Sequence, residues 1–243
     1  MSSEKREAFI ENVRALRRVL VVSTIGVVVL FLVLFYGFCD PLMNFVLQPV
    51  RSRGINMIAT AVSEALLTRF KVCLVAGLVC AMPLIMQQVW SFVSPALYPH
   101  EKKTFAILFF VALALFVGGV IFCCLYVFPL AIDLFWSSAE GVANTMWSVE
   151  EYYNFVLSFV LPFGLMFEMP VLLYMLARRG KVTYEKLAKF RKYMLLLIVI
   201  LAAILTPPDV ISQLMLAAPM YLLYEISVQI VRFMRKKPAE TED

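Results

Sequence analysis

Apolar runs of about 20 residues recur along the chain, and they constrain its fold more than any other feature. The runs 19–38, 70–92 and 104–128 each reach the length that a helix needs to cross about 30 Å of hydrocarbon. Hydrophobic residues make up 62% of the 243 residues and charged residues 16%, whereas soluble domains have about 45–50% and about 25%. A water-soluble domain and a disordered chain are therefore excluded. We expect an all-α integral membrane protein.

The runs predict six transmembrane helices, which fill residues 1–235 as a single domain. A fourth span is expected over about 153–176, and the last two runs, 194–205 and 210–225, have 12 and 16 residues. Helices of this size are only about 18 and about 24 Å long, so they predict a thinned bilayer and a concave groove. Polar flanks that reach the interfaces are the alternative. The polar residues 236–243 are expected to form a disordered cytoplasmic tail.

Lysine and arginine are distributed unequally between the two sides of the predicted bundle. Eighteen of them fall on the side of both termini, and four on the other side: Arg51, Arg53, Arg69 and Lys71. Cytoplasmic loops carry an excess of these residues. We therefore expect both termini in the cytoplasm.

Neither catalysis nor metal binding is expected from the reactive residues. Four of the five cysteines lie inside apolar runs and no CxxC pair is present, which argues against a disulfide framework or a metal site. The only histidine, His100, has no obvious nucleophile beside it, and the sequence has no GxSxG, HExxH or Walker A motif. We therefore expect no enzyme activity, no cofactor and no metal. Because the positive charge follows the loops, we expect no nucleic-acid partner either.

Glu168 is the strongest candidate for a functional residue. It lies between Pro162 and Pro170 in the fourth span, nine residues before Ala177, and hence about 13 Å inside the cytoplasmic end of the helix. An ionisable group there costs at least about 2.5–3.5 kcal/mol, so it is expected to face protein or water and to have a function. The structural alternative is a protonated glutamate that is hydrogen-bonded to a neighbouring helix.

The last span contains three further polar residues. Asp209 follows two prolines and is expected to cap the N-terminus of this helix, with Gln213 one turn later on the same face. Glu225 is expected to form an interfacial ion pair with Arg232 or Arg235.

Three other residues lie near the ends of the spans. Glu101 precedes Lys102 and Lys103 at the start of the third span, where an acidic side chain is favoured by the helix dipole. Phe92, at the end of the second span, is typical of an interfacial aromatic belt. Pro49 belongs to a turn signal after the first span. In addition, glycines within the spans permit close approach of helices: Gly26, Gly77, Gly118, Gly119 and Gly164.

Three separated motifs resemble those of the TatC family, the multispanning receptor component of the twin-arginine protein translocase. Residues 87–103, QQVWSFVSPALYPHEKK, are similar to the family segment Q-x-W-x-F-x-x-P-(G/A)-L-Y-x-x-E-(R/K). Residues 163–170, FGLMFEMP, are similar to F-G-x-x-F-E-x-P. The run 202–213, AAILTPPDVISQ, follows in family order. The resemblance covers most of the chain.

The resemblance implies a receptor in the bacterial inner membrane that exports folded proteins with the proton-motive force. Glu101 would pair with the arginines of a signal peptide, Phe92 would offer an apolar or cation–π surface, and Arg17 is retained in the amino-terminal segment. Glu168 and Gln213 would meet single-span partner subunits of TatA/TatB type. The resemblance also implies contacts with lipids and homo-oligomers in the complex. A proton-coupled solute transporter that uses Glu168 is the alternative function.

The amino-terminal segment departs from the family pattern H-x-x-E-L-R-x-R. Alignment on Arg17 places Asn12 at the histidine and Ala15 at the glutamate. Part of the recognition surface is therefore altered. Either Glu101 carries more of the acidic role, or Glu11 substitutes from a nearby helical turn.

Overall fold

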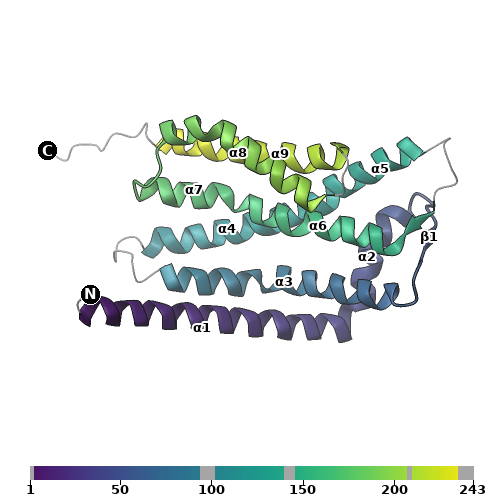
Figure 1. Ribbon diagram of the computed structural model, residues 1–243, viewed down its shortest axis with the longest axis horizontal. Helices are drawn as coiled ribbons and strands as arrows, with labels where there is room; N and C mark the ends of the chain where they lie inside the picture. Colours follow the sequence, from purple (N-terminus) through teal and green to yellow (C-terminus); the bar gives the residue numbers. More distant parts are fainter. Residues whose placement is uncertain (1–2, 94–101, 140–145, 207–209, 235–243) are drawn as a thin grey trace. The chain divides into compact units, whose positions relative to one another are not determined.

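The computed structural model describes residues 3–93, 102–139, 146–206 and 210–234 and is almost entirely helical (Figure 1). This confirms the all-α prediction. The elements are, in order, α1 (Ser3–Val33), the π-helix η1 (Leu34–Phe38), α2 (Cys39–Arg51), β1 (Met57–Ile58), α3 (Glu64–Val93), α4 (Lys102–Phe122), the π-helix η4 (Cys123–Val127), α5 (Phe128–Ala139), β2 (Trp147–Ser148), α6 (Val149–Phe167), α7 (Met169–Arg178), α8 (Tyr184–Leu205) and α9 (Val210–Met234).

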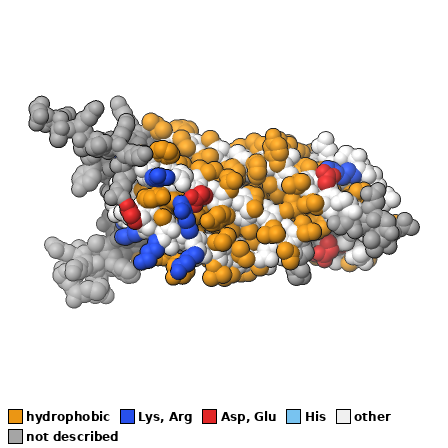
Figure 2. All heavy atoms as spheres, turned by 90° about the horizontal axis from the view of Figure 1, so that it is seen from above, with side chains coloured by type: hydrophobic (Ala, Val, Ile, Leu, Met, Phe, Trp, Pro, Cys, Tyr) orange, Lys and Arg blue, Asp and Glu red, His pale blue; other side chains and the backbone are white. Residues whose placement is uncertain are grey.

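The described residues contain five helical segments that are long and apolar enough to cross a membrane: Val13–Arg51, Glu64–Val89, Ala106–Ser137, Val149–Arg178 and Val210–Met234. Large hydrophobic side chains stay exposed on them, as a lipid-facing surface requires. On the face shown in Figure 2, hydrophobic side chains cover the middle and charged side chains gather toward the ends. The protein is a multi-pass membrane protein.

The last two helices are longer than the sequence suggested. α8 has 22 residues and α9 has 25, lengths of about 33 and about 38 Å, so the predicted lengths of 12 and 16 residues are wrong. The apolar runs are short, but the helices continue through their polar flanks. α8 begins ten residues before Met194, where the hydroxyl of Thr183 accepts a bond from the backbone N–H of Lys186 at 3.5 Å. The groove and the cytoplasmic termini stay predictions, and the tail 236–243 lies outside the described residues.

The chain divides into two compact units, and the single domain stays a prediction. The first unit comprises residues 1–51, 57–113 and 147–153. In it α1 and α3 run side by side (Figure 1). A Cβ atom on Gly77 would lie only 3.0 Å from the backbone of Phe31, so a glycine is needed for this close approach of the two helices.

The first unit also joins α2 to the beginning of α6. The hydroxyl of Tyr152 donates to the carbonyl of Val46 at 2.7 Å, and that of Tyr153 donates to the carbonyl of Met43 at 2.9 Å. Pro49 lies half-buried in the last turn of α2. Beside these contacts β1 and β2 pair in parallel.

The second unit comprises residues 52–56, 114–146 and 154–243. Aromatic rings fill its interior, where Phe116, Phe159 and Phe163 are fully buried. Within this unit α9 packs against both α7 and α8. Glu168 lies in this unit, between α6 and α7.

Candidate functional site

Glu168 occupies the one residue between α6 and α7. Its backbone N–H donates to the carbonyl of Leu165 at 3.1 Å, a bond one residue shorter than the α-helical one. Pro170 has no N–H to donate and therefore disfavours an unbroken helix across this point. The α-helical hydrogen-bond pattern resumes at Leu172, whose backbone N–H donates to the carbonyl of Glu168 at 3.0 Å. Pro162 lies inside α6 without ending it.

The carboxyl group of Glu168 is buried and incompletely satisfied. The residue is 8% exposed, and its Oε1 has no hydrogen-bond partner among the described residues. The preceding residue, Phe167, packs on Gly119 and lies 5.8 Å from Phe122 between ring centroids. A buried carboxyl oxygen is costly unless something binds it. Glu168 is therefore the best candidate for an intramembrane contact site.

Gln213 does not complete a polar pair with Glu168. It lies half-buried on α9, and its side-chain amide donates to the carbonyl of Val199 on α8 at 3.1 Å. This bond ties α9 to α8 within the second unit. Asp209, the predicted cap of the same helix, lies outside the described residues.

Glu225 forms its ion pair across helices rather than along its own. Nη2 of Arg191 on α8 lies 2.5 Å from Oε1 of Glu225, and Gln229 donates to the same oxygen at 3.2 Å. The guanidinium of Arg232 instead lies over the ring of Tyr184, 5.6 Å from its centroid. The prediction that Glu225 pairs with Arg232 is therefore wrong. The basic first half of α8 lies against α9, and its Arg191 lies opposite Glu225. Arg235 lies outside the described residues.

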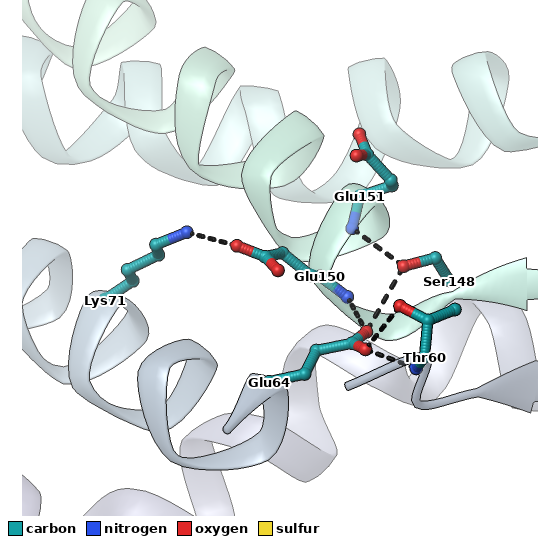
Figure 3. Close-up of polar contacts among 6 residues, drawn as sticks. All are labelled: Thr60, Glu64, Lys71, Ser148, Glu150 and Glu151. Atoms are coloured by element: carbon teal, nitrogen blue, oxygen red, sulfur yellow. Dashed lines mark hydrogen bonds and ion pairs between the residues drawn. The ribbon is translucent and has the colours of Figure 1, made fainter. Parts of the chain in front are cut away.

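A second buried carboxylate, Glu64 at the start of α3, was missed by the sequence analysis. It is 1% exposed, and it accepts hydrogen bonds from Thr60, Ala61, Ser148 and Glu150 (Figure 3). The only local signal is an acidic residue in the first turn of a span, a position common enough to pass for ordinary helix capping. Two of its partners lie more than 80 residues away in sequence.

The four basic residues of the less positive side all contact acceptors. The partners and distances are Arg51 to Asn44 at 2.9 Å, Arg53 to Asp133 at 2.6 Å, Arg69 to Asp40 at 2.9 Å and Lys71 to Glu150 at 2.8 Å. These cations are thus engaged within their own units.

Comparison with known proteins identifies the family. The family model of the Sec-independent protein translocase protein TatC matches residues 11–219. Proteins of that name from Carboxydothermus hydrogenoformans and Escherichia coli K12 are 39% and 35% identical to this chain, over 96% and 100% of it and 96% and 95% of their own lengths. The chain belongs to the TatC family. Membership confirms the resemblance seen in the three motifs and supports a role in protein translocation, a transport function rather than catalysis.

A solved structure of the twin-arginine translocase receptor TatC is similar to this chain over most of its length. The TM-score is 0.87 and the identity 34%, and the match covers 93% of this chain and 100% of the other. The second TatC motif, residues 163–170, forms the break that holds Glu168.

The remaining predicted TatC residues are only partly described. Arg17 is exposed on α1, and Phe92 lies in the last turn of α3. Glu101 lies outside the described residues. The predicted signal-peptide site therefore stays a prediction.

Proposed function

We propose that this protein is the receptor of a twin-arginine translocase in a bacterial inner membrane. It binds the signal peptides of folded cargo proteins, assembles with single-span TatA/TatB-type subunits and further copies of itself among lipids, and uses the proton-motive force. The observation that carries the proposal is the likeness, over nearly the whole chain, to a structure solved as a twin-arginine translocase receptor. In this arrangement both termini lie in the cytoplasm, the two units work as one domain, and Pro49 and Asp209 belong to a cap on the opposite side.

Signal-peptide recognition is assigned to Glu101, Phe92 and Arg17. A carboxylate binds guanidinium through charge-assisted hydrogen bonds that are stronger than neutral ones. Phe92 supplies an apolar or cation–π surface. Because Asn12 and Ala15 replace polar residues of the family pattern, Glu101 carries the larger share of the recognition, with Glu11 as the alternative acid.

Replacing Glu101 with alanine should weaken binding of the arginine pair by between about tenfold and about a hundredfold, because the loss of a charge-assisted pair costs about 1.5–3 kcal/mol. The measurement is photo-crosslinking of a signal peptide to the purified protein, with a peptide that has two glutamines in place of the arginines for comparison. The matched control is Glu11→Ala. Equal crosslinking of both peptides to the unsubstituted protein and to Glu101→Ala would contradict the assignment.

Partner assembly is assigned to Glu168, with Gln213 on the neighbouring α9. The carboxyl oxygen, which has no hydrogen-bond partner among the described residues, fits a polar side chain on a partner's membrane helix. An interhelical hydrogen bond in lipid is worth only about 0.6–2 kcal/mol, which suits a contact that forms and breaks during each transport cycle.

Replacing Glu168 with alanine should reduce export of folded cargo by about tenfold, whereas glutamine should retain most of it because an amide still makes hydrogen bonds. Export is measured in cells that supply the partner subunits, with Glu151→Ala, an exposed glutamate on α6, as control. A proton-coupled solute transporter would need a titrating group, so glutamine would then fail as completely as alanine. Normal export by both variants would remove Glu168 from the mechanism.

A further inference from the structure

Glu64 joins two chain segments that are far apart in the sequence. Its Oε2 accepts bonds from the backbone N–H and the hydroxyl of Thr60, the latter at 2.9 Å, and from the N–H of Ala61 at 3.0 Å. Its Oε1 accepts bonds from the N–H of Glu150 at 2.7 Å and from the hydroxyl of Ser148 at 3.2 Å. Figure 3 shows both oxygens at the point where the donors of Thr60, Ser148 and Glu150 converge. One buried side chain therefore satisfies five donors.

The donors come from two parts of the chain. Thr60 and Ala61 lie four and three residues before the first residue of α3, whereas Glu150 lies in the first turn of α6. The first N–H groups of a helix have no partner within it and need an external acceptor. Glu64 thus supplies the acceptor for an N–H group in the first turn of α6 and also holds the segment that leads into α3. A carboxylate is well suited to this because it only accepts hydrogen bonds when ionised.

Further contacts of the first unit surround Glu64. The parallel pairs Met57–Trp147 and Ile58–Ser148 lie beside it, and Lys71 binds the carboxylate of Glu150 at 2.8 Å. The ion pair between Lys71 and Glu150 is partly exposed, and the two paired strands have only two residues each. Glu64, in contrast, is 1% exposed. Glu64 is therefore the buried centre of the attachment of α6 to α3.

We propose that Glu64 is a positioning residue of the translocase, which anchors the beginning of α6 and must stay bonded for transport. α6 is a continuous helix from Val149 to Phe167, and the next residue is Glu168. A shift or rotation at the start of a helix displaces the turns that follow it along the same helix. The proposal requires only the translocation function of the TatC family, and it is independent of the signal-peptide assignment.

The test separates anchoring from stability by restoring the link covalently. Paired residues of neighbouring strands lie about 4.8 Å apart, within the Cα separation of about 4.4–6.8 Å that a disulfide spans. Met57→Cys and Trp147→Cys are therefore introduced together, with and without Glu64→Ala. Export per copy in the membrane is measured under oxidising and reducing conditions, and disulfide formation is followed by the change in gel mobility. Each single cysteine variant is the control.

Glu64→Ala should lower export per copy by about tenfold, and the oxidised disulfide should restore it to within about twofold of the matching Glu64 protein. Glu64→Gln, which keeps the shape but turns an N–H₂ group toward donors, should slow disulfide formation and reduce export. If the alanine variant does not reach the membrane, export per copy is measured with Glu64→Gln instead. Unchanged export per copy in both Glu64 variants, or a loss that the confirmed disulfide does not restore, would overturn the proposal.

Discussion

Replacing Gly119 with alanine is expected to destabilise the protein by about 1–3 kcal/mol, the usual cost of overpacking a well-filled interior. A Cβ atom there would lie 2.7 Å from Cγ and 2.9 Å from Cβ of Phe167. These atoms belong to the base of the side chain, so a rotation of the ring alone does not relieve the clash. The end of α6 must move instead, and Glu168 follows directly. Thermal unfolding in detergent measures the loss of stability.

Gly118 provides a matched control, because beyond its chain neighbours and its own helix backbone no heavy atom of the described residues lies within 4 Å of a Cβ atom built on it. Gly118→Ala should be neutral or raise stability by up to about 1 kcal/mol through the better helix propensity of alanine. Phe167→Ala, which removes Cγ and the ring, should cost less stability in the Gly119→Ala protein than in the unsubstituted protein, because it also removes most of the clash. Equal effects of alanine at the two adjacent glycines would contradict the packing argument.

The same two glycines show how far the sequence could predict this fold. Small residues in a span indicate close helix packing, and Gly119 does pack closely against Phe167. Gly118 makes no such contact among the described residues, since neighbouring residues on a helix point about 100° apart. Which of them meets another helix depends on the rotation of α4 about its axis. The sequence contains little information about that angle, because α4 is apolar all round.

Membrane segments were predictable from hydropathy, but helix ends were not. Hydropathy reports where a chain is apolar, whereas a helix continues until caps or prolines stop it. The polar first half of α8, from Tyr184 to Lys192, is helical for that reason. Glu168 was recognisable because a carboxylate in an apolar run is costly wherever the run folds. Glu64 was not, since its importance comes from Ser148 and Glu150, which only the folded chain brings to it.

The ion pair between Arg191 and Glu225 should stabilise the attachment of α8 to α9, and its removal is the second large effect that we expect. The side chains are 36% and 34% exposed, so each single alanine variant should cost about 1–3 kcal/mol, between the values for surface and buried pairs. Nε of Arg191 and Oε2 of Glu225 are buried without a hydrogen-bond partner among the described residues. Removing either side chain therefore leaves a partly buried charge with fewer contacts than it has now.

A double-mutant cycle decides whether the pair itself matters. Arg191→Ala combined with Glu225→Ala should cost less than the sum of the single changes by about 1–2 kcal/mol, because the second change removes a charge that the first left unpaired. Lys189→Ala, at an exposed position of the same helix, is the control for loss of positive charge and should stay within about 0.5 kcal/mol. Strict additivity would show that Arg191 and Glu225 act separately. The α8–α9 attachment would then depend on other contacts, such as the bond from the hydroxyl of Tyr224 to the carbonyl of Leu187 at 2.8 Å.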